Sequence, residues 1–269
     1  MGRKYTKELL EEQLAEAGVV STDCLMVHSS MKAIGDVEAR PGEPGGAETV
    51  IDALLESLSD GMLLMPTHTW KQMSAEYNVF DPATEPACVG ILPNLFRKRE
   101  GVYRSLHPTH SMAACGRKVI CGNRVVITAD EYVKGEENTQ TPCAPGGCWD
   151  RLRVVEAKIL LVGVTHARNT FIHSIEEALD VPERFTAQQT LFYVKMPDKT
   201  LKPVPMYRHY SVHTAHISEM FDKLMNYYFE TGAAKKCKFG DADCILCDAR
   251  ALFGATKEKL DQDLDFFMH

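Results

Sequence analysis

The residues with the clearest chemical potential are a histidine and a glutamate three positions apart, His173 and Glu176. If the segment is helical, the two side chains share one face, and the carboxylate can orient the imidazole and stabilise its protonated form. An imidazole held in this way is a candidate general base. The pair follows a short apolar run, 159–164, which predicts a buried strand ending in a polar turn. Such turns on a rigid sheet often carry functional residues.

A second polar segment begins at His28, at the end of another predicted strand. It continues through Ser29 and Ser30 into a loop that leads to paired glycines and Thr49 at a helix start. Backbone N–H groups at a helix N-terminus suit a phosphate, and glycine allows it to approach closely. The same residues also fit a plain turn with a helix cap. No G-x-x-x-x-G-K-[ST] sequence is present, so a P-loop is not predicted.

A third polar segment, 104–111, contains an arginine, two histidines and two serines. Arg104 has the fork geometry to bind a phosphate or carboxylate through two hydrogen bonds. His107 precedes a proline, which holds it extended and suits a hydrogen-bonding role in a loop. Taken alone, this segment fits a structural role better than a functional one.

The elements expected to position these residues alternate between helix and strand. The pattern predicts a helix over 5–17, a strand over 24–28, a loop over 29–45, a helix from 46 to 61 and a strand over 62–66. This alternation predicts an α/β protein, layered α/β/α around a central mixed sheet. Strands at 190–196 and 202–207 are expected to form a hairpin, and 216–229 and 249–267 predict a C-terminal helix-rich part. No repeat or long linker interrupts the chain, so we expect a single domain over residues 1–269.

Bulk properties exclude several classes of protein. A chain of 269 residues with 45% apolar content can bury a sizeable core. It contains no run of eighteen apolar residues, so no membrane span is predicted. No apolar stretch follows the charged start, so no signal peptide is expected, and the nine cysteines predict free thiols in the cytoplasm. The net charge of −7 disfavours nucleic acid and favours a cationic partner.

Six ordered blocks of sequence give the chain a resemblance to the aminoglycoside 3-N-acetyltransferase family, whose fold differs from that of the histone-type N-acetyltransferases. The blocks are His28-Ser29-Ser30-x-x-Ala33-Ile34-Gly35, Gly45-Gly46-Ala47-Glu48-Thr49, Met65-Pro66-Thr67-x-Thr69, Arg104-Ser105-x-His107-Pro108-x-x-Ser111, Thr141-Pro142-x-x-Pro145-Gly146, and Leu161-x-Gly163-Val164 followed by Asn169-Thr170-Phe171-x-His173-x-x-Glu176. They occur in the family's order and cover residues from about 28 to 177.

The resemblance implies an enzyme that transfers an acetyl group from acetyl-CoA to an amine of an aminoglycoside, and we expect no metal. In similar proteins the position of His173 is the proposed catalytic histidine, and Glu176 belongs to the same signature. The residues that we expect to contact the coenzyme are Ser29, Ser30, Met31, Lys32, Ala33, Ile34, Gly35, Gly46, Thr49, His107 and Ser111. Backbone amides of the 29–35 loop and the Ser111 hydroxyl are candidate donors to the oxyanion of the transition state.

An aminoglycoside carries several positive charges, so its binding site should be acidic. The candidate carboxylates are Asp81, Glu177, Asp180 and Glu183. Many members of the family also use an acidic residue in the strand region after the signature helix. The corresponding segment here, 206–211, contains no Asp or Glu, so no third catalytic partner is assigned.

Other functions fit parts of the sequence. A metal-dependent hydrolase would account for His107-x-x-His110 and His213-x-x-His216, but H-E-x-x-H is absent, and the C-x-x-C at 244–247 supplies only half of a zinc site. A serine amidase would need G-x-S-x-G, which is also absent, and no cysteine lies in a cysteine-amidase signature. A coenzyme-binding protein without activity, or an N-acetyltransferase of another small amine, remains an alternative. The apolar end, Phe266-Phe267-Met268, would pack on the core or on a second subunit, which leaves a homodimer open.

Overall fold

The computed structural model describes residues 4–120, 125–136, 140–210 and 216–268. Its centre is a sheet with the strand order β10-β11-β7-β1-β2-β5-β4, in which β6 also pairs with β5. The strands are β1 (Cys24–Ser29), β2 (Met62–Pro66), β4 (Tyr103–Arg104), β5 (Met112–Ile120), β6 (Val125–Thr128), β7 (Lys158–Val162), β10 (Ala234–Phe239) and β11 (Ala242–Asp248). β1 pairs in parallel with β2 and β7, whereas β5 and β11 run antiparallel to their neighbours, so the sheet is mixed as predicted.

The three parallel strands are buried on both faces, which explains their apolar sequences. Every residue of β2 is buried, and β1 and β7 each have one terminal residue that is only partly buried. Successive side chains enter two different cores: Met26 belongs to one, and Leu25 and Val27 belong to the other. The sheet therefore separates two apolar layers.

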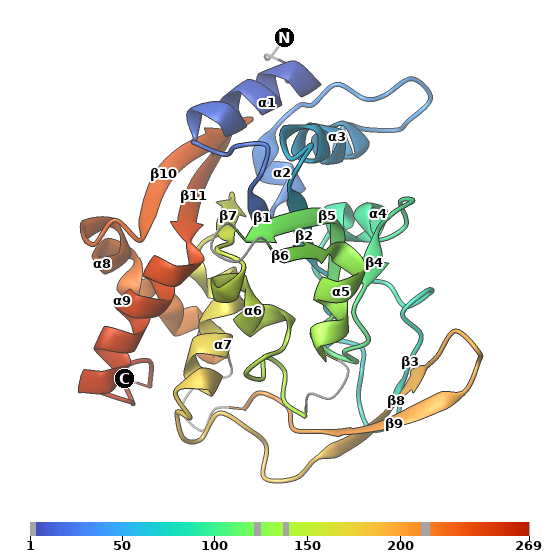
Figure 1. Ribbon diagram of the computed structural model, residues 1–269, viewed down its shortest axis with the longest axis vertical. Helices are drawn as coiled ribbons and strands as arrows, with labels where there is room; N and C mark the ends of the chain where they lie inside the picture. The colour runs from blue at the N-terminus through green and yellow to red at the C-terminus, as the bar shows by residue number, and fades with distance from the viewer. Residues whose placement is uncertain (1–3, 121–124, 137–139, 211–215, 269) are drawn as a thin grey trace.

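Helices cover both faces of this sheet (Figure 1). One face carries α1 (Lys7–Glu16), α2 (Met31–Ile34), α3 (Ala47–Ser57) and α4 (Ile91–Phe96). The other carries α5 (Ala129–Val133), α6 (Cys148–Val154), α7 (Phe171–Ala178), α8 (Met225–Glu230) and α9 (Ala249–Gln262). Short 3₁₀ helices are η1 (Lys134–Glu136), η2 (His166–Arg168) and η3 (Ile217–Leu224). The predicted α/β/α layering around a mixed sheet is confirmed.

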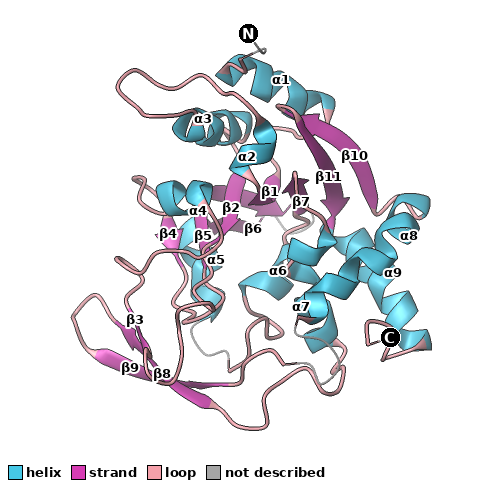
Figure 2. Cartoon of the chain, turned by 180° about the vertical axis from the view of Figure 1, so that it is seen from behind, coloured by secondary structure: helices cyan, strands magenta, loops and turns pink. Residues whose placement is uncertain are grey.

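A second, small sheet lies away from the C-terminal helices α8 and α9 (Figure 2). It consists of β3 (Val79–Phe80), β8 (Thr190–Lys195) and β9 (Leu201–Met206). β8 and β9 form the predicted antiparallel hairpin, and β3 joins β8 in parallel. The sheet has its own small core, made of Met73, Phe80, Phe192, Val194 and Met206.

Several local predictions differ from the structure. The predicted loop over 29–45 contains α2, and the helix predicted over 216–229 is divided into η3 and α8. The C-terminal part contains the hairpin of β10 and β11 as well as helices, and this hairpin extends the main sheet beyond β7. The strands depend on cross-strand pairing, a non-local contact that local spacing does not reveal.

The C-terminal cysteines and phenylalanines are part of the core. Cys244 and Cys247 on β11 belong to the cores on opposite faces of the sheet, so they cannot bind one metal ion together. Phe267 is fully buried and lies 4.9 Å from Phe221, ring centre to ring centre, so the chain end packs on its own core. None of the helices in the described ranges is both long and apolar enough to cross a membrane.

The topology brings distant segments to one edge of the main sheet. The carboxyl ends of β1, β2 and β7 meet there because these strands are parallel, and ligands commonly bind at such an edge. β5 begins at the same edge, since Met112 pairs with Pro66 at the end of β2. Gly163 follows β7 with φ +61°, and a Cβ there would overlap Ala33 of α2. Glycine is therefore required for α2 to pack closely beside the end of β7.

Candidate active site

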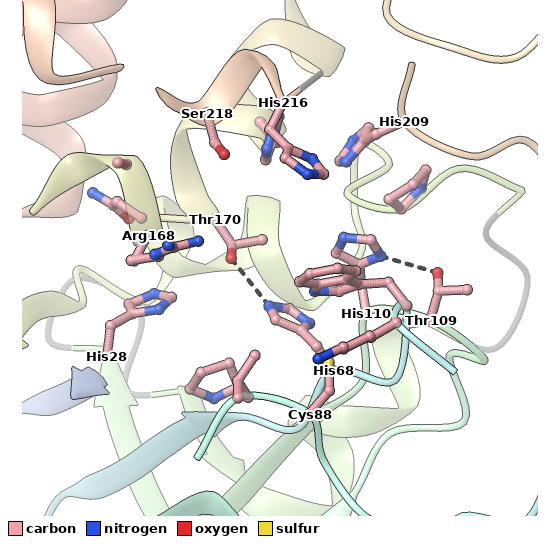
Figure 3. A pocket seen from close by; sticks show the side chains of 18 of the residues that line it. His28, His68, Cys88, Thr109, His110, Arg168, Thr170, His209, His216 and Ser218 are labelled. Carbon is pink, nitrogen blue, oxygen red and sulfur yellow. Dashed lines mark hydrogen bonds between the residues drawn. The ribbon is translucent and has the colours of Figure 1, made fainter. Parts of the chain in front are cut away.

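A cavity of about 560 Å³ opens at this edge of the sheet (Figure 3). Its walls come from the segments after β1, β2 and β7, from the segment before β5, and from the chain between β9 and η3. Six histidines are among the described residues that line it: His28, His68, His110, His173, His209 and His216. Such a volume is typical of a small-molecule site.

His173 occupies the first turn of α7 and has the contact predicted for it. Its Nδ1 lies 3.1 Å from Oε2 of Glu176, and the other carboxylate oxygen accepts a hydrogen bond of 2.6 Å from Nε of Arg184. The Glu176 side chain is 1% exposed and the His173 side chain is 12% exposed. A buried carboxylate thus links a buried guanidinium to an imidazole that reaches the cavity. Sequence spacing did not point to Arg184, because it lies beyond the end of the helix.

The environment keeps His173 uncharged at neutral pH. Burial and the neighbouring His209 lower the pKa of His173 below its ordinary value, although Glu176 opposes this shift. Burial by itself would raise the pKa of Glu176, but the hydrogen bonds and charges of His173 and Arg184 hold it below its usual range. The site therefore pairs a neutral imidazole with an ionised carboxylate, which is the arrangement that a general base requires.

A second histidine and glutamate lie directly against the first pair. The His209 ring stacks on the His173 ring with their centres 4.2 Å apart, and Nε2 of His209 lies 2.9 Å from Oε1 of Glu177. Glu177 was expected to bind a cationic substrate. Its side chain is 2% exposed and also accepts hydrogen bonds from the Thr141 hydroxyl (2.6 Å) and the Cys143 amide (2.8 Å).

The remaining deep histidines of the cavity are also neutral at neutral pH. Burial lowers the pKa of His68 and of His110 well below the usual value, and it lowers the pKa of His28 to about 3. His68 Nε2 lies 3.0 Å from the Thr170 hydroxyl, and His110 Nδ1 lies 2.9 Å from the Thr109 hydroxyl (Figure 3). These rings therefore form an uncharged polar wall.

The residues expected to contact the coenzyme fall into three groups, and Ser29 is the one described member of the first group, 29–35, that lines the cavity. The following residues, Ser30 to Gly35, form and flank α2 beside the end of β7. Gly46 and Thr49 have close contacts within the protein: a Cβ at Gly46 would overlap Val37, and the Thr49 hydroxyl donates a hydrogen bond of 2.6 Å to the Glu38 carbonyl. Neither is among the described residues that line the cavity.

The third group, His107 and Ser111, lies behind the cavity wall. His107 Nδ1 accepts a hydrogen bond of 2.8 Å from the His110 amide, and burial lowers the pKa of His107 to about 4. The Ser111 hydroxyl donates to the Thr67 carbonyl at 2.7 Å, and Arg104 donates to the same carbonyl at 2.8 Å. Arg104 therefore holds strands together in the interior, where burial lowers its pKa to about 9, rather than facing a ligand.

The charges along the cavity wall are positive. The described lining residues include Lys71, Arg168 and Arg208 but no Asp or Glu, and within the described ranges these three cations form no ion pair. The expected acidic residues lie elsewhere. Asp81 pairs with Lys195 at 2.8 Å, Asp180 and Glu183 are exposed after α7, and none of the three lines the cavity. His213 lies outside the described residues, and the sequence of 211–215 contains no carboxylate.

Among the described residues, one group of side chains of types that can hold a metal ion lies near His173. Cys143, Glu177 and His209 each place a potential ligand atom within 4.8 Å of the others. The carboxylate of Glu177 and Nε2 of His209 already bond to each other, and burial raises the pKa of the Cys143 thiol well above its usual value. A cysteine binds zinc as a thiolate, and every ligand must offer a free donor atom, so this group fits a hydrogen-bonded cluster better than a zinc site.

Comparisons with known proteins agree with this geometry. The model of the aminoglycoside 3-N-acetyltransferase family matches residues 26–261. The chain is 26% identical to aminoglycoside N(3)-acetyltransferase III of Salmonella sp, with 94% of this chain and 91% of that protein covered. It is 27% identical to aminoglycoside N(3)-acetyltransferase IV of Salmonella sp, with 100% and 92% covered.

Solved structures show the same fold. The apoenzyme of AAC(3)-IVa superimposes with a TM-score of 0.79 at 25% identity, covering 100% of this chain and 93% of that one. AAC-IIIb, solved as a binary complex with CoASH, has a TM-score of 0.79 at 20% identity, with 97% of each chain covered. The match to the family model includes the strands, turns and helices that build the cavity. The chain therefore belongs to the aminoglycoside 3-N-acetyltransferase family and is an acyltransferase enzyme.

Proposed function

We propose that this protein transfers the acetyl group of acetyl-CoA directly to the 3-amino group of an aminoglycoside, with His173 as the general base. The observation that carries the proposal is the position of the His173 ring, which lines the cavity while Nδ1 is held by the buried Glu176. An ionised carboxylate only accepts hydrogen bonds, so Nδ1 bears the proton and Nε2 keeps its lone pair. This nitrogen is available to take a proton from the amine.

The proton balance of the reaction is simple. The amine enters as an ammonium ion and becomes nucleophilic only after it releases one proton to bulk water. The neutral amine attacks the thioester carbonyl, and His173 takes the remaining surplus proton from nitrogen as the C–N bond forms. The C–S bond then breaks, and the leaving thiolate receives that proton from the imidazolium, so His173 returns to its starting state. Glu176 stabilises the imidazolium while it exists.

The charge of the cavity supports a bound coenzyme. The whole chain has 37 acidic and 30 basic residues, yet the described lining of the cavity has cations and no carboxylate. Coenzyme A carries several phosphate groups, and arginine and lysine side chains bind phosphates well. Arg168 follows β7 at the same edge as Ser29, so it is our candidate for a phosphate contact. The relative AAC-IIIb has been solved with CoASH.

The choice of acceptor rests on the relatives. A mutant of AAC(3)-IVa in which alanine replaces a histidine has been solved in complex with a gentamicin. It shares 26% identity with this chain and superimposes with a TM-score of 0.79. The curated relatives are named as aminoglycoside N(3)-acetyltransferases. We carry the same substrate class and position over to this protein.

One observation favours a second candidate, the acetylation of another small amine. A polycationic aminoglycoside is best bound by carboxylates. The described cavity lining has none, and Glu177 is already hydrogen-bonded within the protein. A small amine with few positive charges would fit this lining without such partners.

The test is release of coenzyme A thiol from acetyl-CoA with a panel of aminoglycosides and simple amines. We expect turnover with at least one aminoglycoside. We also expect His173→Ala to lower turnover by roughly two or more decades while coenzyme binding, measured by calorimetry, stays nearly unchanged. Turnover with simple amines alone would favour the second candidate. Near-normal turnover of the His173 variant would contradict its role as the base.

A further inference from the structure

Two consecutive glutamates of α7 each hold one of two stacked histidines. Glu176 binds His173 at 3.1 Å, and Glu177 binds His209 at 2.9 Å. The two imidazole rings lie 4.2 Å apart at an angle of 28°, and both line the cavity. The histidines come from different elements, since His173 lies on α7 and His209 follows β9. The cavity wall thus contains two adjacent acid–base pairs rather than one.

The two glutamates differ in how their negative charges are balanced. Glu176 forms an ion pair with the buried Arg184, so a guanidinium already neutralises its charge. Glu177 is held by the Thr141 hydroxyl and the Cys143 amide, which are uncharged donors. In the part of the chain that the structure describes, His209 is the only ionisable side chain paired with Glu177. The uncompensated negative charge of the cluster therefore lies next to His209.

We propose that His209 is a positioning residue that carries the positive charge of the stacked pair and so keeps His173 uncharged. Two imidazolium rings at this separation would repel each other, so the pair takes up its first proton on one ring. The negative charge of Glu177 favours that proton on His209. The negative charge of Glu176 favours a proton on His173 less strongly, because Arg184 already balances it. The inference rests on the proposed role of His173 as the base, because only the uncharged ring can accept the proton of the amine.

The other groups around His173 do not replace His209 in this role. On its own helix His173 faces Glu176 and Glu177, and Arg184 lies beyond Glu176. From the segments after β2 and before β5 it faces His68 and His110, whose pKa values burial keeps well below the usual range. From η3 it meets the uncharged ring of Phe221 at 4.8 Å. His209 is thus the group in the described surroundings that both stacks on His173 and binds a carboxylate with no other charged partner.

The consequence for the reaction is a wider pH range. Burial is the main cause of the lowered pKa of His173, and a positive charge on the stacked His209 ring adds to it. As pH falls, His209 takes up its proton first, and His173 stays unprotonated down to a lower pH than it would alone. The acid limb of the activity profile therefore lies at lower pH than in a protein without this neighbour.

The direct test does not depend on activity. Imidazole signals are followed by NMR across a pH titration and are assigned through their loss in His173→Phe and in His209→Phe. We expect the His209 signal to show proton uptake at higher pH than the His173 signal. The reverse order, or simultaneous uptake, would overturn the proposal. This readout stands even if no amine on the panel is acetylated, so it separates failure of this inference from failure of the proposed function.

The kinetic test compares pH profiles of kcat/KM. We expect the acid limb to move up by roughly one pH unit in His209→Phe, and the rates of the two proteins to converge near pH 8.5. His216→Phe is the matched control, because His216 lines the same cavity but has no carboxylate partner among the described residues. This variant should leave the acid limb of the kcat/KM profile at the same pH as in the wild type. If kcat/KM of His209→Phe is lowered by the same factor at every pH, His209 contributes through packing alone, and the proposal is overturned.

Discussion

The proposed base depends on a buried carboxylate whose charge is shared between two partners. Glu176 binds His173 through one oxygen and Arg184 through the other, and its side chain is almost fully buried. The His173–Glu176 contact was predicted because both residues lie on one helix, three positions apart. Arg184 was not predicted, because it reaches Glu176 from the turn that follows α7. The interaction that stabilises the carboxylate is therefore the one that the motif does not contain.

Replacing Arg184 should destabilise the protein and impair catalysis together. In Arg184→Met the Glu176 charge would remain buried without its cation, which typically costs about 3–5 kcal/mol. We expect a lower denaturation midpoint in urea and a lower kcat, since Glu176 would no longer be held in place for His173.

A double variant separates these two effects. Adding Glu176→Gln to Arg184→Met removes the unpaired charge, so it should recover much of the stability but none of the activity. The single variant Glu176→Gln completes the comparison. If the stability losses of Arg184→Met and of Glu176→Gln simply add in the double variant, Glu176 and Arg184 are not coupled.

At the scale of elements, the site depends on the close packing of α2 against the end of β7. This contact is possible because Gly163 has no side chain where Ala33 approaches. The apolar runs of β1, β2 and β7 predicted the strands correctly, since buried parallel strands have continuous apolar sequences. Their order in the sheet, and hence the meeting of His28, His68 and His173 at one edge, follows from pairing between distant segments.

Gly163→Ala should displace α2 and weaken coenzyme binding. The new Cβ would overlap Ala33 at a positive φ, which adds strain from the backbone and from crowding. Gly232→Ala is the matched control, because Gly232 has φ +74° but no atom within 4 Å of an added Cβ. We expect the control to lose about 1 kcal/mol of stability, and Gly163→Ala to lose a further ~1–3 kcal/mol.

Coenzyme titration by calorimetry completes this test. Only Gly163→Ala should weaken coenzyme binding, and adding Ala33→Gly should restore part of it by relieving the overlap. Equal effects of the two glycine variants on stability and binding would mean that the contact between α2 and β7 is unimportant.

At the scale of the whole molecule, one buried acid links folding stability to pH. Glu136 on η1 is 5% exposed and accepts a hydrogen bond from the Ser105 hydroxyl. Burial raises the pKa of Glu136 from 4.5 to about 8. Between these values the folded protein holds a proton that the unfolded chain has released, so stability falls as pH rises through this range and levels off above it.

Glu136→Gln should remove this dependence. The amide has the same shape without the charge, so we expect the variant to be more stable than the wild type at about pH 8.5. At about pH 4 the two should be almost equal, because Glu136 is then largely protonated in both the folded and the unfolded state. Thermal denaturation at the two pH values measures the effect. If the midpoint temperatures of the variant and the wild type differ by the same amount at both pH values, Glu136 does not titrate in this way.

The sequence by itself determined the features that depend on neighbouring residues. These are the apolar strands, the β8–β9 hairpin and the His173–Glu176 pair, because periodicity and spacing along the chain set which side chains share a face. Only the tertiary structure decided what surrounds them. Glu177 meets His209 from 32 positions away, and the cations lining the cavity come from separate segments. Such contacts depend on how strands pair and how the helices pack on them, which local spacing does not specify.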